Sequence, residues 1–291
     1  MKVFEEETIT LRGLLWHSAF IFVFAAVFGY YSLQLPRDDN PRYSTPAMIN
    51  GTADNPFVSR ALVPVLLRFM PDFIANKVLA LSALTLFGWG YAMRWLASGV
   101  GRTFEMRDEV IALFGSPFFF LRVAHIGDLM TLLLTTLCLA ALAREKHTQR
   151  HGLYLALFAL ATINRETSFL LIIISTLYFR RASFTIAQLL IFVSLRGAIM
   201  FFFAANTGTL AEWHWQDHIT RMVSAYDLTI LSGCVVALVL SRLNLRAAHP
   251  LMRTAFIVTA PALAVLYFLF GYPFEFRVFL EVYPVVLLKG E

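Results

Sequence analysis

Apolar runs separated by short polar segments follow one another along almost the whole chain. These runs are expected to be helices, and they cover residues 13–35, 74–97, 110–124, 127–143, 152–163, 167–179, 184–204, 227–241, 254–270 and 278–288. A helix that crosses a bilayer needs roughly 20 apolar residues, and neighbouring short runs can pair as tight helical hairpins. The pattern predicts an all-α, polytopic integral membrane helix bundle of about ten spans, several of them short or paired as hairpins.

The composition supports a membrane protein. Hydrophobic residues make up 58% of the 291 residues, and the mean hydropathy of +0.67 is far above that of a soluble domain. No Pro-, Gly- or Ser-rich linker divides the chain, so residues 1–291 are expected to form a single transmembrane domain with one long outer loop at about residues 36–73. The first run is longer than the apolar part of a cleaved signal peptide and is expected to be retained.

The distribution of Lys and Arg predicts the orientation, because these residues are retained on the cytoplasmic side. With both termini inside, the cytoplasmic segments contain Lys2, Arg12, Arg102, Arg107, Arg144, Lys146, Arg150, Arg180, Arg181, Arg242, Arg246, Arg253 and Lys289. Beyond the first outer loop, each basic residue of the outer face has an acid nearby: Arg122 with Asp128, Arg165 with Glu166, Arg221 with Asp217 and Arg277 with Glu275. The pI near 9.4 therefore reflects topology, and no pattern indicates a nucleic-acid partner.

The polar sequence Asn164-Arg165-Glu166-Thr167 separates two apolar runs that are each too short to span a bilayer. Either one continuous helix carries an ion pair inside the membrane, or two short helices meet at a turn on one face. In both arrangements the charges lie beside the membrane, where a lone charge costs about 2.5–3.5 kcal/mol. Arg165 is therefore either half of a structural Arg–Glu pair that joins two helices or part of a substrate site.

The long first outer loop contains two sets of candidate residues. Asp38 and Asp39 directly follow the first run, and such a pair can supply a general base or hold a divalent cation; Asp-Asp-Asn-Pro is also ordinary turn chemistry. Farther along, Arg60 and Arg68 have the spacing of one face of an amphipathic helix in the headgroup layer. They either steer an anionic lipid head or extend to phosphates without a specific ligand.

A second polar group lies between the third and fourth runs, where Arg122, His125 and Asp128 fall within seven residues. A His–Asp couple can orient a hydroxyl or transfer a proton, and the three-residue spacing places both side chains on one side of a helix. No metal-site spacing links this group to His214 and His218, so no metal site is predicted from them.

Two later segments add aromatic and acidic groups. Trp213-His214-Trp215 lies in the second-longest outer segment, where Trp is typical of an interfacial anchor and can also stack on sugars. Glu275 and Arg277 precede the last run, and Glu281 lies about one turn inside it. An acid there is expected to face the bundle interior, where it can pair with Arg277.

Four of these features together resemble the bacterial GT-C-type membrane glycosyltransferases. They are a long first outer loop that opens with acids, a His-x-x-Asp at the head of the fourth helix, Asn-Arg-Glu-Thr between short helices, and a late Glu-x-Arg-x-x-x-Glu-x-x-Pro. The resemblance covers most of the chain and rests on this layout more than on any fixed motif. Members of the family often have more spans and a large outer domain for acceptor recognition, which this chain lacks.

The resemblance implies an inverting transfer of a sugar from a polyprenyl-phosphate donor to an acceptor at the outer face of a bacterial inner membrane. Asp38 or Asp39 would activate the acceptor, while Arg165, with Arg60 or Arg277, would hold the departing lipid phosphate. The remaining expected substrate-binding residues are Arg122, His125, Asp128, Glu166 and Glu275. The expected partners are the lipid-linked sugar donor, membrane lipids and a protein that recognises the acceptor.

Two other classes stay open. A transporter or channel for an anionic or lipid-linked substrate would use the broken helix at 164–167 to present helix ends to its cargo, although the polar residues cluster on one predicted face. A non-catalytic assembly subunit, or an acyl-transfer relative, would use the same ion pairs to hold helices together.

Overall fold

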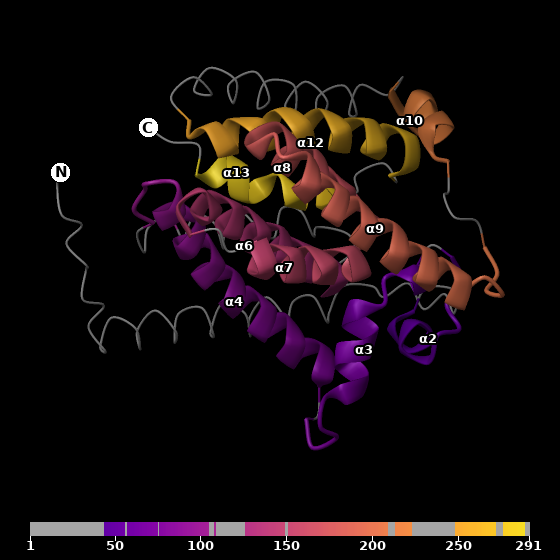
Figure 1. The fold of residues 1–291 in the computed structure, drawn as a ribbon. Coiled ribbons are helices and arrows are strands. Elements are labelled where there is room, and N and C mark those ends of the chain that lie inside the picture. Colours follow the sequence, from indigo (N-terminus) through magenta and orange to yellow (C-terminus); the bar gives the residue numbers. More distant parts are fainter. Residues whose placement is uncertain are drawn as a thin grey trace, which may run out of the picture.

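The computed structural model describes residues 44–55, 57–74, 76–104, 108, 126–148, 151–208, 213–222, 248–271 and 276–288. The described part consists of helices joined by turns and links, with one isolated bridge between Asn55 and Gly208. Its elements, labelled as in Figure 1, are α2 (Thr45–Asn50), η1 (Phe57–Ser59), α3 (Leu62–Phe69), α4 (Lys77–Gly99), α6 (Ile126–Thr148), α7 (His151–Asn164), η3 (Glu166–Ser168), α8 (Phe169–Phe179), α9 (Ala182–Phe202), α10 (Trp215–Met222), α12 (Pro250–Phe270), η4 (Phe276–Glu281) and α13 (Tyr283–Leu287).

The predicted apolar runs correspond to helices wherever the structure describes them, with one correction. The run at 278–288 is not a continuous helix, because the 3₁₀ turns of η4 end at Glu281 and the short α13 begins only at Tyr283. Pro284 falls in the first turn of α13, where its missing N–H is tolerated. The predicted runs 13–35, 110–124 and 227–241 lie outside the described residues.

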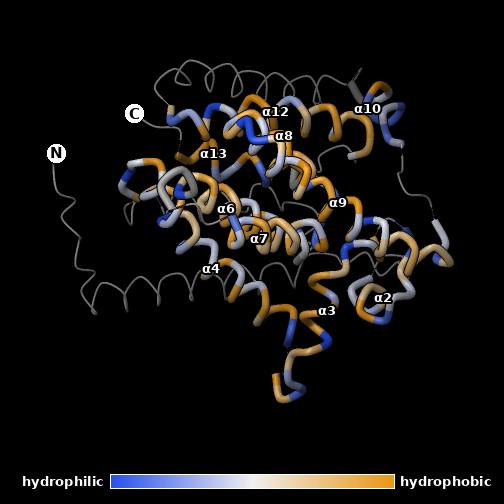
Figure 2. Tube along the Cα trace, in the orientation of Figure 1, coloured by the Kyte–Doolittle hydropathy of each residue, from blue (hydrophilic) through white to orange (hydrophobic). Residues whose placement is uncertain are grey.

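Three of the described helices are long and apolar enough to cross a membrane: the segments Gly127–Arg144 of α6, Ala182–Phe202 (α9) and Pro250–Phe270 (α12). They differ in their surroundings. Most of the α6 segment is buried among other helices, whereas α9 carries large apolar side chains on its exposed surface, such as Leu190, Val193 and Phe201. Figure 2 colours much of the α9 backbone as hydrophobic. A hydrophobic surface of this extent suits contact with lipid, and the described part has the character of a membrane protein.

The core is built around α6, which packs against both α4 and α7 and is drawn next to them in Figure 1. Trp89 of α4 is fully buried, donates its indole N–H to the Thr136 hydroxyl over 3.1 Å, and stacks on Tyr283 of α13. The Trp nitrogen thus has the partner that a buried indole requires. At the far end of α4, Gly99 allows close packing, because a Cβ there would lie 2.9 Å from the Cβ of Ala143.

A buried amide joins three helices below the lipid-facing surface of α9. Gln188 is fully buried, and its Oε1 accepts hydrogen bonds from Tyr154 of α7 and Ser175 of α8, each at 2.9 Å. Its Nε2 donates to the Phe184 carbonyl one turn earlier in α9. Burying a polar side chain costs free energy unless its donors and acceptors form hydrogen bonds. This network therefore fixes the rotation of α9 about its axis.

The segment before α3, which contains residues 51–55, folds back against the far end of α9. The Asn206 amide donates to the carbonyls of Gly51 and Ala53, both at 2.9 Å, and Asn55 N–H donates to the Thr207 carbonyl over 2.8 Å. Gly208 has a φ of 97° and lies so close to Asn55 that a Cβ would be 2.6 Å from its carbonyl oxygen. This docking places the loop beside the end of the bundle where α7 ends and α8 begins.

The amphipathic helix predicted from the spacing of Arg60 and Arg68 is shorter than expected. α3 begins at Leu62, so Arg60 lies in the link between η1 and α3, and the prediction that it shares one helical face with Arg68 is wrong. Arg60 is instead turned toward the bundle, with its guanidinium over the Phe57 ring. Within α3, Val63 and Leu67 are buried, while Arg68 is exposed.

The close contact at Gly99 predicts the effect of a larger side chain. Gly99→Val pushes α4 away from α6 and is expected to lower the free energy of unfolding by about 1–3 kcal/mol, the usual cost of overpacking. Gly197→Val is a matched control inside α9, because a Cβ at Gly197 meets nothing within 4 Å. Unfolding in mixed micelles, titrated with a denaturing detergent, measures both. Equal losses in the two variants would contradict the packing explanation.

Candidate functional site

The polar sequence 164–167 breaks the chain into two short helices. α7 has 14 residues and ends at Asn164, Arg165 has an extended backbone (φ −157°, ψ 144°), and η3 leads into the 11-residue α8. At 1.5 Å per residue, the two helices are about 21 and 16 Å long, too short to cross a bilayer core of about 30 Å. Of the two predicted arrangements, the structure has two short helices that meet at a turn.

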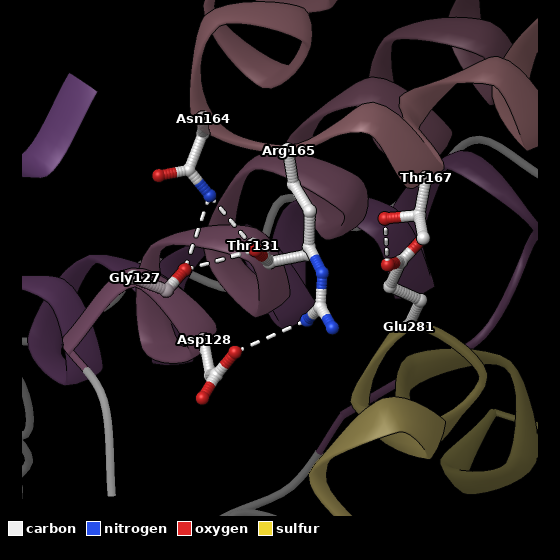
Figure 3. Close-up of polar contacts among 7 residues, drawn as sticks. All are labelled: Gly127, Asp128, Thr131, Asn164, Arg165, Thr167 and Glu281. Atoms are coloured by element: carbon white, nitrogen blue, oxygen red, sulfur yellow. Dashed lines mark hydrogen bonds and ion pairs between the residues drawn. The ribbon is translucent and has the colours of Figure 1, made fainter. Parts of the chain in front are cut away.

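Asn164 fixes the end of α7 to the first turn of α6. Its Nδ2 donates to the Gly127 carbonyl over 3.0 Å and to the Thr131 hydroxyl over 2.8 Å, while Thr131 itself donates to Gly127 over 2.9 Å (Figure 3). Asn164 and Thr131 are both buried. Because the amide reaches two groups of one helical turn, it sets the position of the following residue, Arg165.

Arg165 forms a buried ion pair with Asp128, also in the first turn of α6. Arg165 Nη1 and Asp128 Oδ1 are 3.1 Å apart, and their side chains are only 9% and 2% exposed. The carboxylate also lies near the positive end of the α6 dipole, which stabilises negative charge. The ion partner of Arg165 expected from the sequence was Glu166. The structure corrects this, because the extended backbone at Arg165 sends the two neighbouring side chains to different partners.

Thr167 and Glu281 connect this turn to η4. The Thr167 hydroxyl donates to Glu281 Oε1, and the buried Glu281 carboxylate also interacts electrostatically with Arg165. Figure 3 shows the Arg165 guanidinium between Asp128 and the Thr167–Glu281 pair. As predicted, Glu281 faces the bundle interior.

Glu166 lies on another side of the turn and faces two further arginines. Its Oε2 is 3.5 Å from Nη2 of Arg196, which is located in the last third of α9. The Arg196 guanidinium is held by Ser59, donating to its carbonyl over 3.1 Å and to its hydroxyl over 3.3 Å. Glu166 also interacts electrostatically with Arg60, which directly follows Ser59 in the chain, and with Arg165.

Together these residues form an ionic cluster, defined as Arg60, Asp128, Arg165, Glu166, Arg196 and Glu281. Guanidinium groups bind phosphate and carboxylate through a planar fork of donors and stabilise charge on a leaving group. The cluster can therefore bind an anion if the anion displaces one of the cluster's own carboxylates from its arginine.

The structure brings together four of the predicted site residues, Arg60, Asp128, Arg165 and Glu166, with Glu281, which the sequence also singled out. The backbone of Arg277 lies in η4, while its side chain falls outside the described part. The predicted site residues Asp38, Asp39, Arg122, His125 and Glu275 also lie outside the described residues.

Sequence reasoning missed Arg196. The signal was present, because an arginine inside an otherwise apolar run of a membrane protein normally faces other protein groups and marks a functional or structural site. Ser59 carried no comparable signal. Its part in the cluster depends on the docking of the first loop against α9, which no local pattern encodes.

The Trp213 segment packs against the end of α12 instead of joining the cluster. The Trp213 ring lies 4.8 Å from that of Phe270, and His218 Nε2 donates to the Gly271 carbonyl over 2.8 Å. Asp217, expected beside Arg221, is 3.1 Å from His214 Nδ1. Within the described residues, no group of three His, Cys, Asp or Glu side chains is placed to hold a metal ion.

Comparisons with known proteins identify no family. No family model matches the chain, and no curated protein or solved structure matches it significantly.

The buried pair predicts a strong dependence of folding on Asp128. Asp128→Asn removes the ion-pair partner of a buried Arg165 and is expected to reduce the free energy of unfolding by about 3–5 kcal/mol. Asp217→Asn removes a carboxylate that is 59% exposed and is expected to cost less than about 1 kcal/mol.

A double-mutant cycle with Arg165→Gln completes this test. The double variant should lose less stability than the sum of the single variants, because the second substitution removes the charge that the first left unpaired. Denaturing-detergent titration measures all three variants. Strict additivity would show that the two side chains do not stabilise each other.

Proposed function

We propose that this chain is a GT-C-type membrane glycosyltransferase that moves a sugar from a polyprenyl-phosphate donor to an acceptor at the outer face of the membrane. One observation carries the proposal: Arg60, Arg165 and Arg196 converge on the turn at η3, at one end of a membrane helix bundle, where the first outer loop docks. Arginines gathered beside a membrane are suited to the phosphate of a lipid-linked donor.

The proposed reaction is an inverting displacement. The acceptor hydroxyl oxygen forms a bond to the anomeric carbon of the sugar as the bond from that carbon to the donor phosphate oxygen breaks. Asp38 or Asp39 takes the hydroxyl proton, and the lipid phosphate departs with the electron pair. Arg165, with Arg60 or Arg277, stabilises the charge that develops on this phosphate. A divalent cation at the Asp38–Asp39 pair and a partner protein that recognises the acceptor belong to the same proposal.

The proposed topology is a bundle of about ten spans, several of them short or paired as hairpins, in a bacterial inner membrane, with both termini in the cytoplasm. The ionic cluster would then face outward. The described basic residues at the opposite ends of the helices support this orientation, since Lys and Arg are retained inside. These residues are Arg102, Arg144, Arg180, Arg181 and Arg253.

Cysteine accessibility tests this orientation. In a variant with Cys138 and Cys234 replaced, a membrane-impermeant thiol reagent applied to intact cells is expected to label Asn40→Cys and to leave His147→Cys unlabelled. Permeabilised cells provide the control, because both positions should then react. Labelling of His147→Cys alone in intact cells would reverse the topology and with it the placement of the site.

The proposed base is tested by Asp38→Asn and Asp39→Asn. Asn is nearly isosteric with Asp but cannot accept the proton of the acceptor, so one of the two variants should lose about 10²–10⁴-fold in transfer rate while still binding the donor lipid. Purified protein, polyprenyl-phosphate sugars and separate binding and transfer assays give both values. Parental rates in both variants would exclude both carboxylates as the base.

Transport of an anionic or lipid-linked substrate is the second candidate function, and the observed break between α7 and α8 favours it. Broken helices present backbone groups to cargo in many transporters. Polar groups also continue from the break along α7, α8 and α9, through Thr162 and Ser168 to Tyr154, Ser175 and Gln188. Movement of labelled donor lipid across proteoliposomes without any sugar transfer would favour transport.

A further inference from the structure

The three carboxylates of the ionic cluster are held very differently. Asp128 and Glu281 are almost completely buried, and Asp128 contacts its arginine at 3.1 Å. The Glu166 side chain is 44% exposed, and its contact with Arg196 is 3.5 Å long. Charge-assisted N–H···O bonds are normally about 2.7–2.9 Å, so the Glu166–Arg196 contact is an ion pair without a hydrogen bond. Its Oε2 atom is buried, but Glu166 is the most exposed of the three carboxylates.

Arg196, in contrast, stays in place when Glu166 moves. Its two terminal nitrogens donate to the carbonyl and hydroxyl of Ser59, and its side chain is only 12% exposed. These bonds tie the guanidinium to the link that contains Arg60. Two arginines from distant parts of the chain are thus held beside one partly exposed carboxylate, which is a preorganised arrangement for an anion.

The position of Arg196 on α9 provides access from the lipid side. Val193 lies three residues earlier, is therefore a neighbour on the helix surface, and is 65% exposed. Phe169 at the start of α8 is also exposed and lies against Phe192 of α9. The Glu166–Arg196 contact therefore borders the apolar surface formed by α8 and α9.

We propose that Glu166 occupies a phosphate-binding site formed by Arg60 and Arg196, and that the phosphate group of a ligand displaces it. Glu166 is then an internal counter-ion, which keeps the two guanidinium groups neutralised beside the membrane while no ligand is bound. Arg165 keeps its ion pair with Asp128, which holds the turn, and its guanidinium stays beside the bound phosphate. The inference rests on the proposed function only for the identity of the lipid; the exchange itself requires only a phosphate group.

Removing the counter-ion should strengthen anion binding. In purified full-length protein, Glu166→Gln is expected to bind inorganic pyrophosphate or polyprenyl phosphate about tenfold or more tightly than the parent, because the ligand no longer competes with a carboxylate. Arg196→Gln should weaken the same binding about tenfold or more. Titration calorimetry measures pyrophosphate binding, and native mass spectrometry measures retention of the lipid, with the uncharged polyprenol as its control.

Two variants separate this effect from a general change in charge. Asp217→Asn also removes one negative charge, and Arg253→Gln also removes one positive charge, but both residues are exposed and lie away from the cluster. Neither should alter anion affinity more than twofold. Arg196→Lys keeps the charge but loses the planar fork, so weakened binding with an unchanged melting temperature separates ligand binding from folding.

The outcomes distinguish a lipid headgroup from a soluble phosphate as the ligand, and the counter-ion role of Glu166 from the glycosyltransferase proposal. Binding of polyprenyl phosphate alone assigns the site to a lipid head, and binding of pyrophosphate alone assigns it to a soluble ligand. An unchanged or lower affinity in Glu166→Gln, or no binding of either probe to parent and variant, overturns the counter-ion role. If affinities change as expected in a protein that transfers no sugar, the glycosyltransferase proposal fails and the counter-ion role stands.

Discussion

The buried ion pair between Asp128 and Arg165 is the contact on which the ends of α6, α7 and α8 depend. An unpaired guanidinium in this position would cost several kcal/mol, so Arg165 must reach a carboxylate. It reaches Asp128 because Asn164 has already bound the first turn of α6 through Gly127 and Thr131. The break between α7 and α8 is thus defined by what its polar groups bind, more than by a helix-breaking residue.

The same constraint explains why Glu166 has a separate role. Once Arg165 is paired with Asp128, the extended backbone directs Glu166 toward α9 and the segment that contains Ser59 and Arg60. There it meets Arg196 and Arg60, which come from distant parts of the sequence. One turn therefore combines a buried, structural pair with a half-exposed, exchangeable one, and the two differ in burial and in contact distance.

α9 connects this chemistry to the membrane. Its exposed surface is apolar, as lipid contact requires, while Phe184, Gln188, Phe192 and Arg196 recur every four residues on its inner side. Gln188 fixes the rotation of the helix by bonding α7 and α8. This rotation brings Arg196 to Ser59 at the edge of the lipid-facing surface, where a lipid phosphate can approach.

The sequence by itself determined the helical class, the membrane character and most described helix positions, because lipid contact requires long apolar runs with internally satisfied backbones. It also indicated the importance of 164–167, since charges beside a membrane need compensation. Pairing was decided by the tertiary structure alone. The sequence suggested that Arg165 pairs with its neighbour Glu166. In the structure Arg165 pairs with Asp128 of α6 and Glu166 with Arg196 of α9, because ion pairs form between groups that packing brings together. Ser59 and Arg196 entered the cluster for the same reason, through the docking of the first loop on α9.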